Sequence, residues 1–253
     1  MRLEGKVAIV TGAGSGFGEG IAKRFAEEGA KLVVNDINDG GGERVASEID
    51  RAQGQGSALY VRADVSDNAA MAGLVDRALA RFGRIDIMVN NAGTTHRNGP
   101  MLGVEEAVFD RVFAVNVKSI YLAALHVVPV MRKQGGGAIL NTASTAGLRA
   151  RAGLVWYCGS KGAAIMLSKA MAQELAPDKI RVNALCPVAG DTPLLPSFMG
   201  GDTPELRAKF LASIPLGRFA TPLDVANAAL YLASDEGAFI TGVALEVDGG
   251  RCI

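Results

Sequence analysis

The sequence predicts a single α/β domain in which a parallel β-sheet is covered by helices on both faces. Short apolar runs rich in β-branched residues alternate along the 253 residues with longer segments whose apolar residues recur at helical spacing. The short runs are continuously apolar, which is typical of strands buried on both faces. No internal repeat, low-complexity segment or linker interrupts the alternation, so we expect one domain over residues 1–253.

The first elements are the most clearly marked. Residues 6–11 (KVAIVT) are a strand, and residues 19–28 are a helix that Gly29 ends, because glycine favours the position just after a helix. A second strand follows at 31–35. The later helices are expected at 42–53, 67–82, 104–133, 156–176 and 222–233, and the later strands at 57–62, 85–90, 137–142, 179–186 and 243–247. Pro129 lies inside the 104–133 helix and should kink or end it.

Charge and composition exclude several kinds of partner. The chain has 26 basic and 26 acidic side chains, and this balance gives no electrostatic basis for binding nucleic acid or an anionic membrane. Its first residues lack a signal-peptide layout, and no stretch approaches the ~18 apolar residues of a membrane span. Cys158, Cys186 and Cys252 have neither metal-ligand spacing nor an even disulfide count. We therefore expect a soluble, cytoplasmic protein without a metal.

A glycine-rich loop joins the first strand to the first helix, with the spacing Gly12-x-x-x-Gly16-x-Gly18. In that position the N–H groups of a helix N-terminus can hold a pyrophosphate, although the spacing differs from the general Gly-x-Gly-x-x-Gly fingerprint. Asp36 ends the second strand, where a carboxylate accepts hydrogen bonds from both hydroxyls of an adenosine ribose and repels a 2′-phosphate. Position 15 is a serine, whereas an arginine or lysine there could have paired with that phosphate. The loop therefore predicts NAD rather than NADP, and the alternative for Asp36 is a helix cap.

Tyr157 and Lys161 are the most informative pair of side chains. At a spacing of four residues they leave the same face of a helix. An ammonium about 4 Å from a phenolate, at an effective dielectric near 20, stabilises it by about 4 kcal/mol, or about three pKa units. We therefore expect Lys161 to lower the pKa of Tyr157 toward the range useful for acid–base catalysis, with Ser144 supplying a hydroxyl to the same substrate oxygen. Alone, the two residues could be an ordinary surface pair, and the glycine loop upstream favours the catalytic interpretation.

An ordered set of motifs resembles the short-chain dehydrogenase/reductase family over the whole chain. Any one motif could arise by chance, whereas the set in this order is specific. The motifs are Thr11-Gly12-x-x-x-Gly16-x-Gly18, Asp64-Val65, Asn90-Asn91-Ala92-Gly93, Asn116, Ser144, Tyr157-x-x-x-Lys161, and Pro187 with Thr192. The resemblance implies a Rossmann-like, doubly wound parallel sheet of seven strands and a homotetramer. The helices at 104–133 and 156–176 are apolar on more than one face, which also favours contacts between subunits.

The resemblance further implies roles for single residues. Tyr157 would be the acid/base, Lys161 would bind the nicotinamide ribose, Ser144 would orient the substrate oxygen, and Asn116 would hold a water of a proton relay. Asp64 would meet the adenine amino group. The implied cofactor-binding residues are Gly12, Ser15, Gly16, Phe17, Gly18, Asp36, Asp64, Val65, Asn91, Ala92, Gly93, Tyr157, Lys161, Pro187, Gly190 and Thr192.

Several of these residues also have plain structural interpretations. Asn90 and Asn91 could form a turn after the fourth strand. Asn116 could bond to a neighbouring carbonyl, and Asp64 could cap a turn. One departure from the family pattern concerns the loop after the sixth strand, where Val188 replaces a usual glycine and Gly190 occupies a usually branched position. Such a change could reshape the floor of the pocket.

The substrate is less well defined by the sequence. Residues 190–215, apolar and rich in Gly and Pro, suit a closing lid, with a short packed helix as the alternative. His96, Arg97, Arg149 and Arg151 could attract a carboxylate or phosphate, and at least two of them are expected to be solvated surface charges.

The sequence thus predicts an NAD-dependent oxidoreductase that interconverts a secondary alcohol, such as a polyol, sugar or hydroxy acid, and its ketone. A 3-oxoacyl-thioester reductase is the nearest alternative, although Asp36 and Ser15 disfavour the NADPH that such reductions use. A catalytically silent protein that senses NAD(H) is an alternative of another class.

Overall fold

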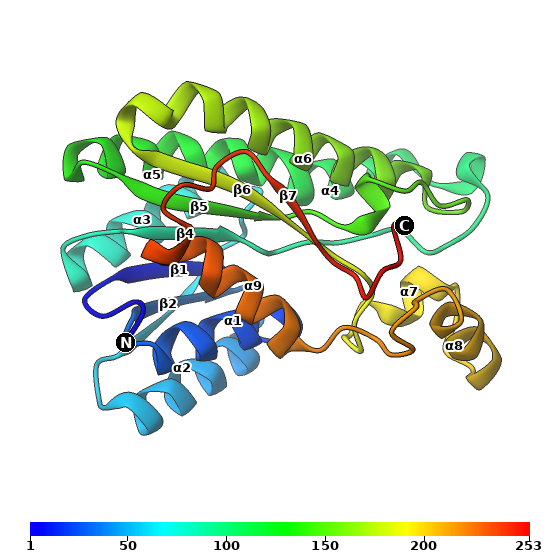
Figure 1. Cartoon of the computed structure of the whole chain (residues 1–253), viewed down its shortest axis with the longest axis horizontal. Coiled ribbons are helices and arrows are strands. Elements are labelled where there is room, and N and C mark those ends of the chain that lie inside the picture. The colour runs from blue at the N-terminus through cyan, green and yellow to red at the C-terminus, as the bar shows by residue number, and fades with distance from the viewer.

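One sheet of seven strands forms the centre of the molecule (Figure 1). The computed structural model describes residues 1–253. The strands are β1 (Val7–Thr11), β2 (Lys31–Asp36), β3 (Ala58–Arg62), β4 (Ile87–Asn90), β5 (Gly137–Thr142), β6 (Ile180–Pro187) and β7 (Ala244–Val247). They run parallel in the order β3-β2-β1-β4-β5-β6-β7, so the strand order reverses between β1 and β4. The predicted fold class and number of strands are confirmed.

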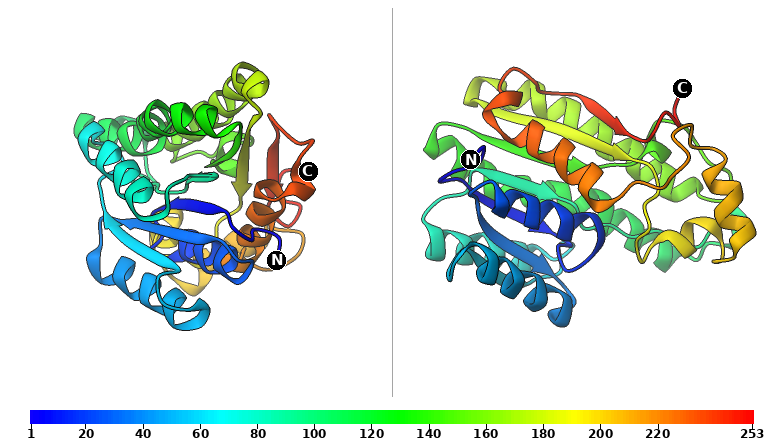
Figure 2. Two further views of the ribbon diagram at one scale, coloured as in Figure 1. Left: turned by 90° about the vertical axis from the view of Figure 1, so that its left-hand side faces the viewer. Right: turned by 60° about the horizontal axis from the view of Figure 1, so that its bottom comes forward.

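Helices cover both faces of the sheet (Figure 2). The helices are α1 (Gly16–Glu27), α2 (Asp39–Gln53), α3 (Asn68–Phe82), α4 (Glu106–Phe113), α5 (Ser119–Gln134), α6 (Val155–Leu175), α7 (Leu195–Met199), α8 (Pro204–Leu211) and α9 (Pro222–Ala233). Helices α1, α2 and α9 pack on one face, and α3, α5 and α6 pack on the other. Helices α7 and α8 lie together beyond the carboxyl ends of the strands, beside the C-terminus (Figure 1).

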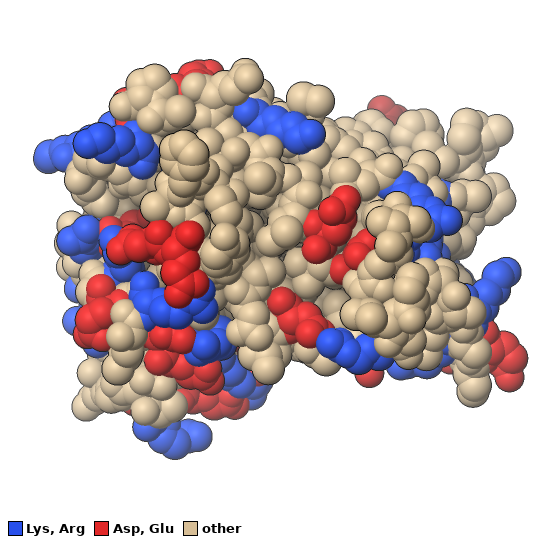
Figure 3. All heavy atoms as spheres, in the orientation of Figure 1, with Lys and Arg blue, Asp and Glu red and all other residues tan.

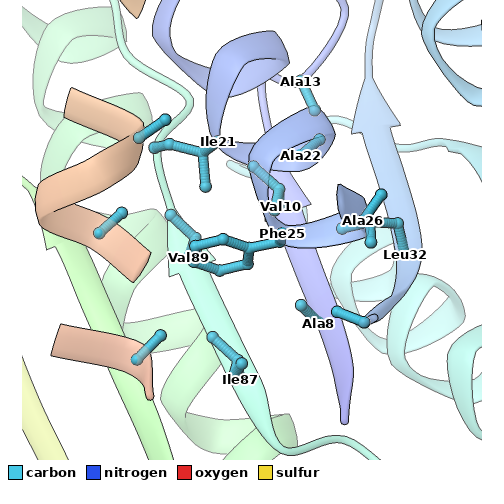
Figure 4. Close-up of a cluster of buried hydrophobic side chains, with 14 of the residues drawn as sticks. Ala8, Val10, Ala13, Ile21, Ala22, Phe25, Ala26, Leu32, Ile87 and Val89 are labelled. Atoms are coloured by element: carbon cyan, nitrogen blue, oxygen red, sulfur yellow. The ribbon is translucent and has the colours of Figure 1, made fainter. Parts of the chain in front are cut away.

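The core between α1, α9 and the sheet fixes the start of α1 (Figure 4). Phe25 and Ile21 of α1 are fully buried against Val10 of β1 and Val89 of β4, which lie opposite each other in the sheet. Full burial of side chains of this size stabilises the fold by about 1.5–3 kcal/mol each. The glycine loop before α1 is therefore held between a buried strand and a buried helix.

Two expected boundaries differ from the structure. Helix α1 begins at Gly16, three residues before the expected start, because glycines in its first turn allow it to approach β1 closely. The expected 104–133 helix is divided into α4, a π-helical turn (Ala114–Lys118) and α5. Pro129 does not end α5, which continues to Gln134. Pro129 leaves the carbonyl of Leu125, four positions earlier, without a helical donor, and Leu125 lies on the exposed side of the helix.

The helical run Glu106–Gln134 is long and apolar enough, by length and composition alone, to cross a membrane. This finding corrects the expectation that no stretch approaches such a length. Half of its apolar window is buried inside the protein, where Leu122, Val127 and Met131 pack in the core with α3 and the sheet. The apolar character of this run is thus partly explained by its core-facing side.

Acidic and basic side chains are interspersed on the surface around α1 and α2 (Figure 3). They form ion pairs there, including Arg44 with Glu19 and Arg24 with Glu28. Exposed pairs of this kind contribute about 0–1 kcal/mol each to stability. The face in Figure 3 shows no extended area of a single sign, which fits the formal net charge of zero.

Candidate active site

A cavity of about 390 Å³ lies at the carboxyl ends of the strands. Loops after β1 and β4 line it, and the strand order reverses between these two strands, which is where open α/β sheets bind ligands. All predicted site residues line the cavity except Gly18 and Asn116. The lining residues among them are Gly12, Ser15, Gly16, Phe17, Asp36, Asp64, Val65, Asn91, Ala92, Gly93, Ser144, Tyr157, Lys161, Pro187, Gly190 and Thr192.

The glycine loop forms one wall of the cavity at positions where side chains would not fit. Gly12 and Gly16 have φ of +60° and +57°, which residues with a Cβ rarely adopt. A Cβ on Gly16 would lie 3.3 Å from Cγ2 of Thr192, and a Cβ on Gly18 would lie 2.2 Å from the carbonyl oxygen of Gly12. Gly18 therefore acts through close packing of α1 on β1. The first turn of α1 begins at the cavity, and its free N–H groups fit the pyrophosphate of a dinucleotide.

Asp36 is held at the end of β2 by two backbone groups. Its carboxylate accepts hydrogen bonds from the N–H groups of Gly14 and Asn38, both at 2.9 Å. These bonds fix its orientation and leave further acceptor capacity on the two oxygens. Arg44, a basic side chain at the glycine loop, donates to the Gly14 carbonyl oxygen and pairs with Glu19. The polar groups at this end of the cavity thus fit two ribose hydroxyls better than a phosphate.

Asp64 is engaged by protein groups. Its carboxylate accepts hydrogen bonds from the N–H and hydroxyl of Ser66 at 2.9 and 2.6 Å, and it pairs with Arg111 at 3.0 Å. Burial raises the pKa of Asp64, but the hydrogen bonds from Ser66 and the pairing with Arg111 outweigh this and hold it below its usual value. The contacts of Asp64 within the protein therefore match its interpretation as a turn-forming residue. A contact between Asp64 and an adenine stays a prediction.

Asn91 joins the ends of β1 and β4. Its side-chain amide donates to the carbonyl oxygens of Thr11 and Gly12 at 2.9 and 3.2 Å. The Thr11 hydroxyl in turn accepts hydrogen bonds from the N–H groups of Asn91 and Ala92, both at 3.0 Å. The side chain of Asn91 thus holds the glycine loop in place beside the cavity that Asn91 itself lines.

Tyr157 and Lys161 lie on α6 with both side chains buried, 6% and 4% exposed. Burial raises the pKa of Tyr157 to about 12, and a hydrogen bond from the Ser144 hydroxyl offsets this in part. Nζ of Lys161 lies 5.9 Å from the centre of the Tyr157 ring and donates to the Thr142 carbonyl oxygen at 2.7 Å. Burial also lowers the pKa of Lys161, to about 8.

The prediction that the pKa of Tyr157 is lowered is therefore wrong for the protein without a bound coenzyme. The prediction started from the ordinary pKa of a phenol and considered only its attraction to the Lys161 ammonium. In the structure the loss of hydration of the buried phenolate is the larger effect. The spacing correctly placed the two side chains on one face of α6, but the sequence could not show how deeply that face is buried.

Asn116 does not line the cavity and instead positions residues that do. It lies in the π-helical turn between α4 and α5, a feature that is frequent at functional sites. Its amide donates to the Thr94 carbonyl oxygen and the Ser160 hydroxyl, and its Oδ1 accepts from the Thr94 N–H. A Cβ on Gly93 would lie 3.4 Å from Nζ of Lys161 and 3.5 Å from Oδ1 of Asn116. The amide thus fixes the loop beside Lys161, and a water relay stays a prediction.

The departure in the loop after β6 has a packing explanation. A Cβ on Gly190 would lie 2.5 Å from the ring of Phe17 and 2.7 Å from the carbonyl oxygen of Ala220. Glycine at 190 therefore makes room for the Phe17 ring, which comes from the glycine loop. Val188 is buried with Phe210 and Ala220 in a small cluster that Phe17 also contacts. The two loops that flank the cavity are packed directly on each other.

Helices α7 and α8 lie in the segment 190–215, where the sequence predicts a closing lid, and they match the alternative of short packed helices. Closure of this lid segment over a substrate stays a prediction. Phe198 of α7 packs on Tyr157 with ring centres 5.1 Å apart. Arg207 of α8 pairs with Asp191 and Asp202, which ties the start of the lid to α8. The lid segment therefore forms part of the cavity wall beside the tyrosine.

The four candidate cations fall into three groups. Arg97 and Arg149 are exposed and donate to the carbonyl oxygens of Gly200 and Arg251, so both are surface charges as expected. His96 is buried, and its Nδ1 lies 3.0 Å from the Arg97 carbonyl oxygen. Arg151 is the one of the four that lines the cavity.

Comparison with known proteins identifies the family. A family model described as Enoyl-(Acyl carrier protein) reductase matches residues 12–251. The chain belongs to the short-chain dehydrogenase/reductase family. It is 50% identical over 254 residues, and 100% of both sequences, to 4-formylbenzenesulfonate dehydrogenase TsaC1/TsaC2 of Comamonas testosteroni.

Solved structures of other short-chain dehydrogenases/reductases agree with this fold. One is described as 3-ketoacyl-(acyl-carrier-protein) reductase from Brucella melitensis complexed with NADH. It is 50% identical, with a TM-score of 0.93 over 99% of this chain and 100% of the other. Another, 7α-hydroxysteroid dehydrogenase complexed with NADH and 7-oxo glycochenodeoxycholic acid, is 40% identical, with a TM-score of 0.92 over 98% and 95% of the two chains. The prediction of an NAD-dependent oxidoreductase is confirmed at the level of the family.

Sequence reasoning missed two residues of this short-chain dehydrogenase/reductase site. Arg111 and Phe210 line the cavity but belong to none of the motifs. Arg111 is recognisable only through its ion pair with Asp64, across 47 positions. Phe210 comes from α8, whose position over the site depends on the fold of the lid. No local sequence signal marks either residue.

The buried ammonium of Lys161 predicts a pH-dependent stability. Its pKa is lowered to about 8 from 10.5, so between these values the unfolded chain binds a proton that the folded protein does not. The contribution of Lys161 to stability should therefore rise with pH across that window, by about 3 kcal/mol, and this rise should be absent from Lys161→Met. Denaturant unfolding at pH 8 and 10.5 measures it. Lys169→Met, at an exposed position of the same helix, should behave as the wild type. Equal pH slopes for wild type and Lys161→Met would contradict the assignment.

Proposed function

We propose that this protein is an NAD-dependent dehydrogenase that interconverts a secondary alcohol and its ketone, with Tyr157 as acid/base. One observation carries the proposal. The buried hydroxyl of Tyr157 lies in the cavity with the Ser144 hydroxyl and the Lys161 ammonium, and the same cavity extends to Asp36. A dinucleotide and a small substrate can therefore meet in one enclosed space.

The residues of the chain account for the movement of the proton. NAD, when bound, supplies the acceptor for the hydride that leaves the alcohol carbon. In oxidation the alcohol O–H proton passes to the oxygen of ionised Tyr157, and in reduction the Tyr157 hydroxyl returns a proton to the carbonyl oxygen. Ser144 donates to the same oxygen and orients it. Lys161 is protonated below its pKa of about 8 and is the cation of this chain beside the tyrosine ring.

The preference for NAD is supported from two sides. Two related proteins have structures solved with NADH. In this chain the carboxylate of Asp36 lies at the end of β2 in the cavity, where it favours ribose hydroxyls over a 2′-phosphate.

The proposal is tested by a panel of polyols, sugars, hydroxy acids, hydroxysteroids and aryl alcohols, with NAD and NADP and with NADH absorbance as the signal. The aryl alcohols are included because a relative is named for an aromatic aldehyde. Turnover with NAD of at least one secondary alcohol is expected. Tight NADH binding without turnover of any alcohol would favour the silent sensor instead.

A 3-oxoacyl-thioester reductase is the second candidate, because a solved relative at 50% identity carries that description. Such an enzyme should reduce acetoacetyl-CoA at a rate comparable with its best small ketone. We expect this chain to favour small ketones with NADH, since Phe198 and Phe210 of the lid close the cavity above Tyr157. Faster reduction of acetoacetyl-CoA would reverse this order.

We also propose that the protein is a cytoplasmic homotetramer. Support comes from the large apolar side chains that remain exposed on α5 and α6, among them Tyr121, Leu125 and Met166. Contacts with other chains in a closed oligomer would cover large apolar side chains such as these. Sedimentation equilibrium should give four times the 26.2 kDa of one chain, and a stable monomer would disprove the assembly.

A further inference from the structure

Arg151 is a cation without a partner. It lies in the loop before α6 and lines the cavity, and its guanidinium makes no hydrogen bond or ion pair with the protein. Its recorded contact is with the face of the Phe210 ring, 4.4 Å from Cζ to the ring centre. The ionisable groups close enough to influence it are Arg251, Cys158 and Tyr157, and none of these is a carboxylate.

The other charged side chains that line the cavity each have a polar partner in the protein. Arg111 pairs with Asp64, and Lys161 donates to the Thr142 carbonyl oxygen. The two carboxylates that line the cavity, Asp36 and Asp64, follow β2 and β3 at its coenzyme end. The end nearest the lid therefore contains no carboxylate: Lys161 has only a neutral partner there, and Arg151 has no polar partner in the protein. Burial disfavours such a charge, and this lowers the pKa of Arg151.

The guanidinium is held in place by the lid. Phe210 is 7% exposed, and its ring also lies 5.3 Å from Cζ of Arg251. Arg251 donates to the Ser213 carbonyl oxygen just after α8, and Arg149 donates to the Arg251 carbonyl oxygen. An arginine that stacks on an aromatic ring keeps its planar N–H groups free for a bidentate ligand. This arrangement prepares Arg151 to bind an anion.

Apolar side chains line the cavity beside both Arg151 and Tyr157: Phe210 contacts Arg151, and Leu154 and Phe198 pack with Tyr157. Leu154 is fully buried and packs with Tyr157 and Phe198 in one cluster. Arg151 and Tyr157 are close enough that the charge of each affects the pKa of the other. One small molecule can therefore reach both groups, with an apolar body between them.

We propose that Arg151 binds a carboxylate or similar oxyanion of the substrate, so that the enzyme acts on alcohols and carbonyls whose apolar body carries a negative charge at its far end. This inference rests on the proposed dehydrogenase function and specifies its substrate class. The guanidinium determines specificity: it fixes the far end of the substrate and thereby places the reacting carbon at Tyr157.

The test compares two alcohols of the same shape, 4-(1-hydroxyethyl)benzoate and the neutral 4-(1-hydroxyethyl)benzamide, with NAD. The wild type should favour the carboxylate by 10–100-fold in kcat/KM. Arg151→Met should lose most of this preference through KM, and it should keep the benzamide kinetics within about two-fold. Arg151→Lys should recover part of the preference. Arg77→Met removes an exposed charge on α3 and should match the wild type.

The outcomes separate this inference from the proposed function. A wild type without preference for the carboxylate, or an Arg151→Met variant that loses both substrates equally, would overturn the anion site and leave the dehydrogenase intact. If neither alcohol is oxidised, calorimetry of 4-acetylbenzoate and 4-acetylbenzamide with the NADH complex tests the site directly. Preferential binding of the carboxylate that depends on Arg151 would support it, and equal binding would overturn it.

Discussion

Tyr157→Phe should lower kcat by about 10³-fold or more, because general acid–base catalysis contributes about 10²–10⁴-fold and no other ionisable hydroxyl lines this end of the cavity. The affinity for NADH should stay within about two-fold. The phenylalanine ring keeps the packing on Phe198 and Leu154, so the variant should also fold. Steady-state kinetics on the best alcohol of the panel, with a fluorescence titration of NADH, measures both quantities.

Tyr231→Phe is the matched control, since Tyr231 is 40% exposed on α9 and lies outside the cavity. It should retain wild-type kcat. Turnover by Tyr157→Phe within about ten-fold of the wild type would show that another group moves the proton, and the proposed mechanism would fall. A parallel loss of NADH affinity would point to damage of the whole site.

Asp36→Asn should change the preference between NAD and NADP by about 10³-fold in the ratio of kcat/KM values. NAD loses charge-assisted hydrogen bonds from its ribose hydroxyls, at about 1.5–3 kcal/mol each. NADP is relieved of repulsion between the carboxylate and its 2′-phosphate, which is about 4 kcal/mol for two unit charges 4 Å apart near a surface. The amide oxygen of asparagine can still accept from one of the two backbone N–H groups that hold Asp36.

Asp39→Asn controls for the loss of one negative charge near the end of β2. Asp39 is exposed at the start of α2 and pairs with Arg62, so its replacement should leave the cofactor ratio within about three-fold. If Asp36→Asn had the wild-type ratio of kcat/KM values for NAD and NADP, the carboxylate would not distinguish the ribose hydroxyls from a 2′-phosphate. The basis for predicting NAD from this residue would then be lost.

The sheet could be predicted from the sequence because most of its strands contain a short, continuous apolar run. Runs such as residues 7–11 and 87–90 are buried along their whole length, so no other element competes for them. The exact extent of the helices could not be predicted in the same way. Gly18 lets the first turn of α1 pack against Gly12 at the end of β1, and Pro129 is tolerated in α5, where Leu125 four positions earlier is partly exposed; both depend on tertiary position.

The candidate site was predictable in its positions and less so in its energetics. Spacing placed Tyr157 and Lys161 on one face of α6, and the motifs brought Asp36 and the glycine loop to the same cavity. The direction of the Tyr157 pKa was missed, because burial is a property of the folded protein and outweighs a single neighbouring charge. The contacts of Asn116 and Arg111 join segments 22 and 47 positions apart, and no local pattern records such distances.

The last residues of the chain contact the lid segment, and this affects where a tag can be attached. Arg251 bonds to the segment after α8 and stacks on Phe210, and Asp248 accepts hydrogen bonds from the N–H groups of Gly250 and Cys252. A purification tag appended after Ile253 would therefore emerge beside α8 and could disturb the contacts of Arg251 with it. The opposite terminus, where Leu3 bonds to the end of α1, is the safer place for a fusion or a surface tether.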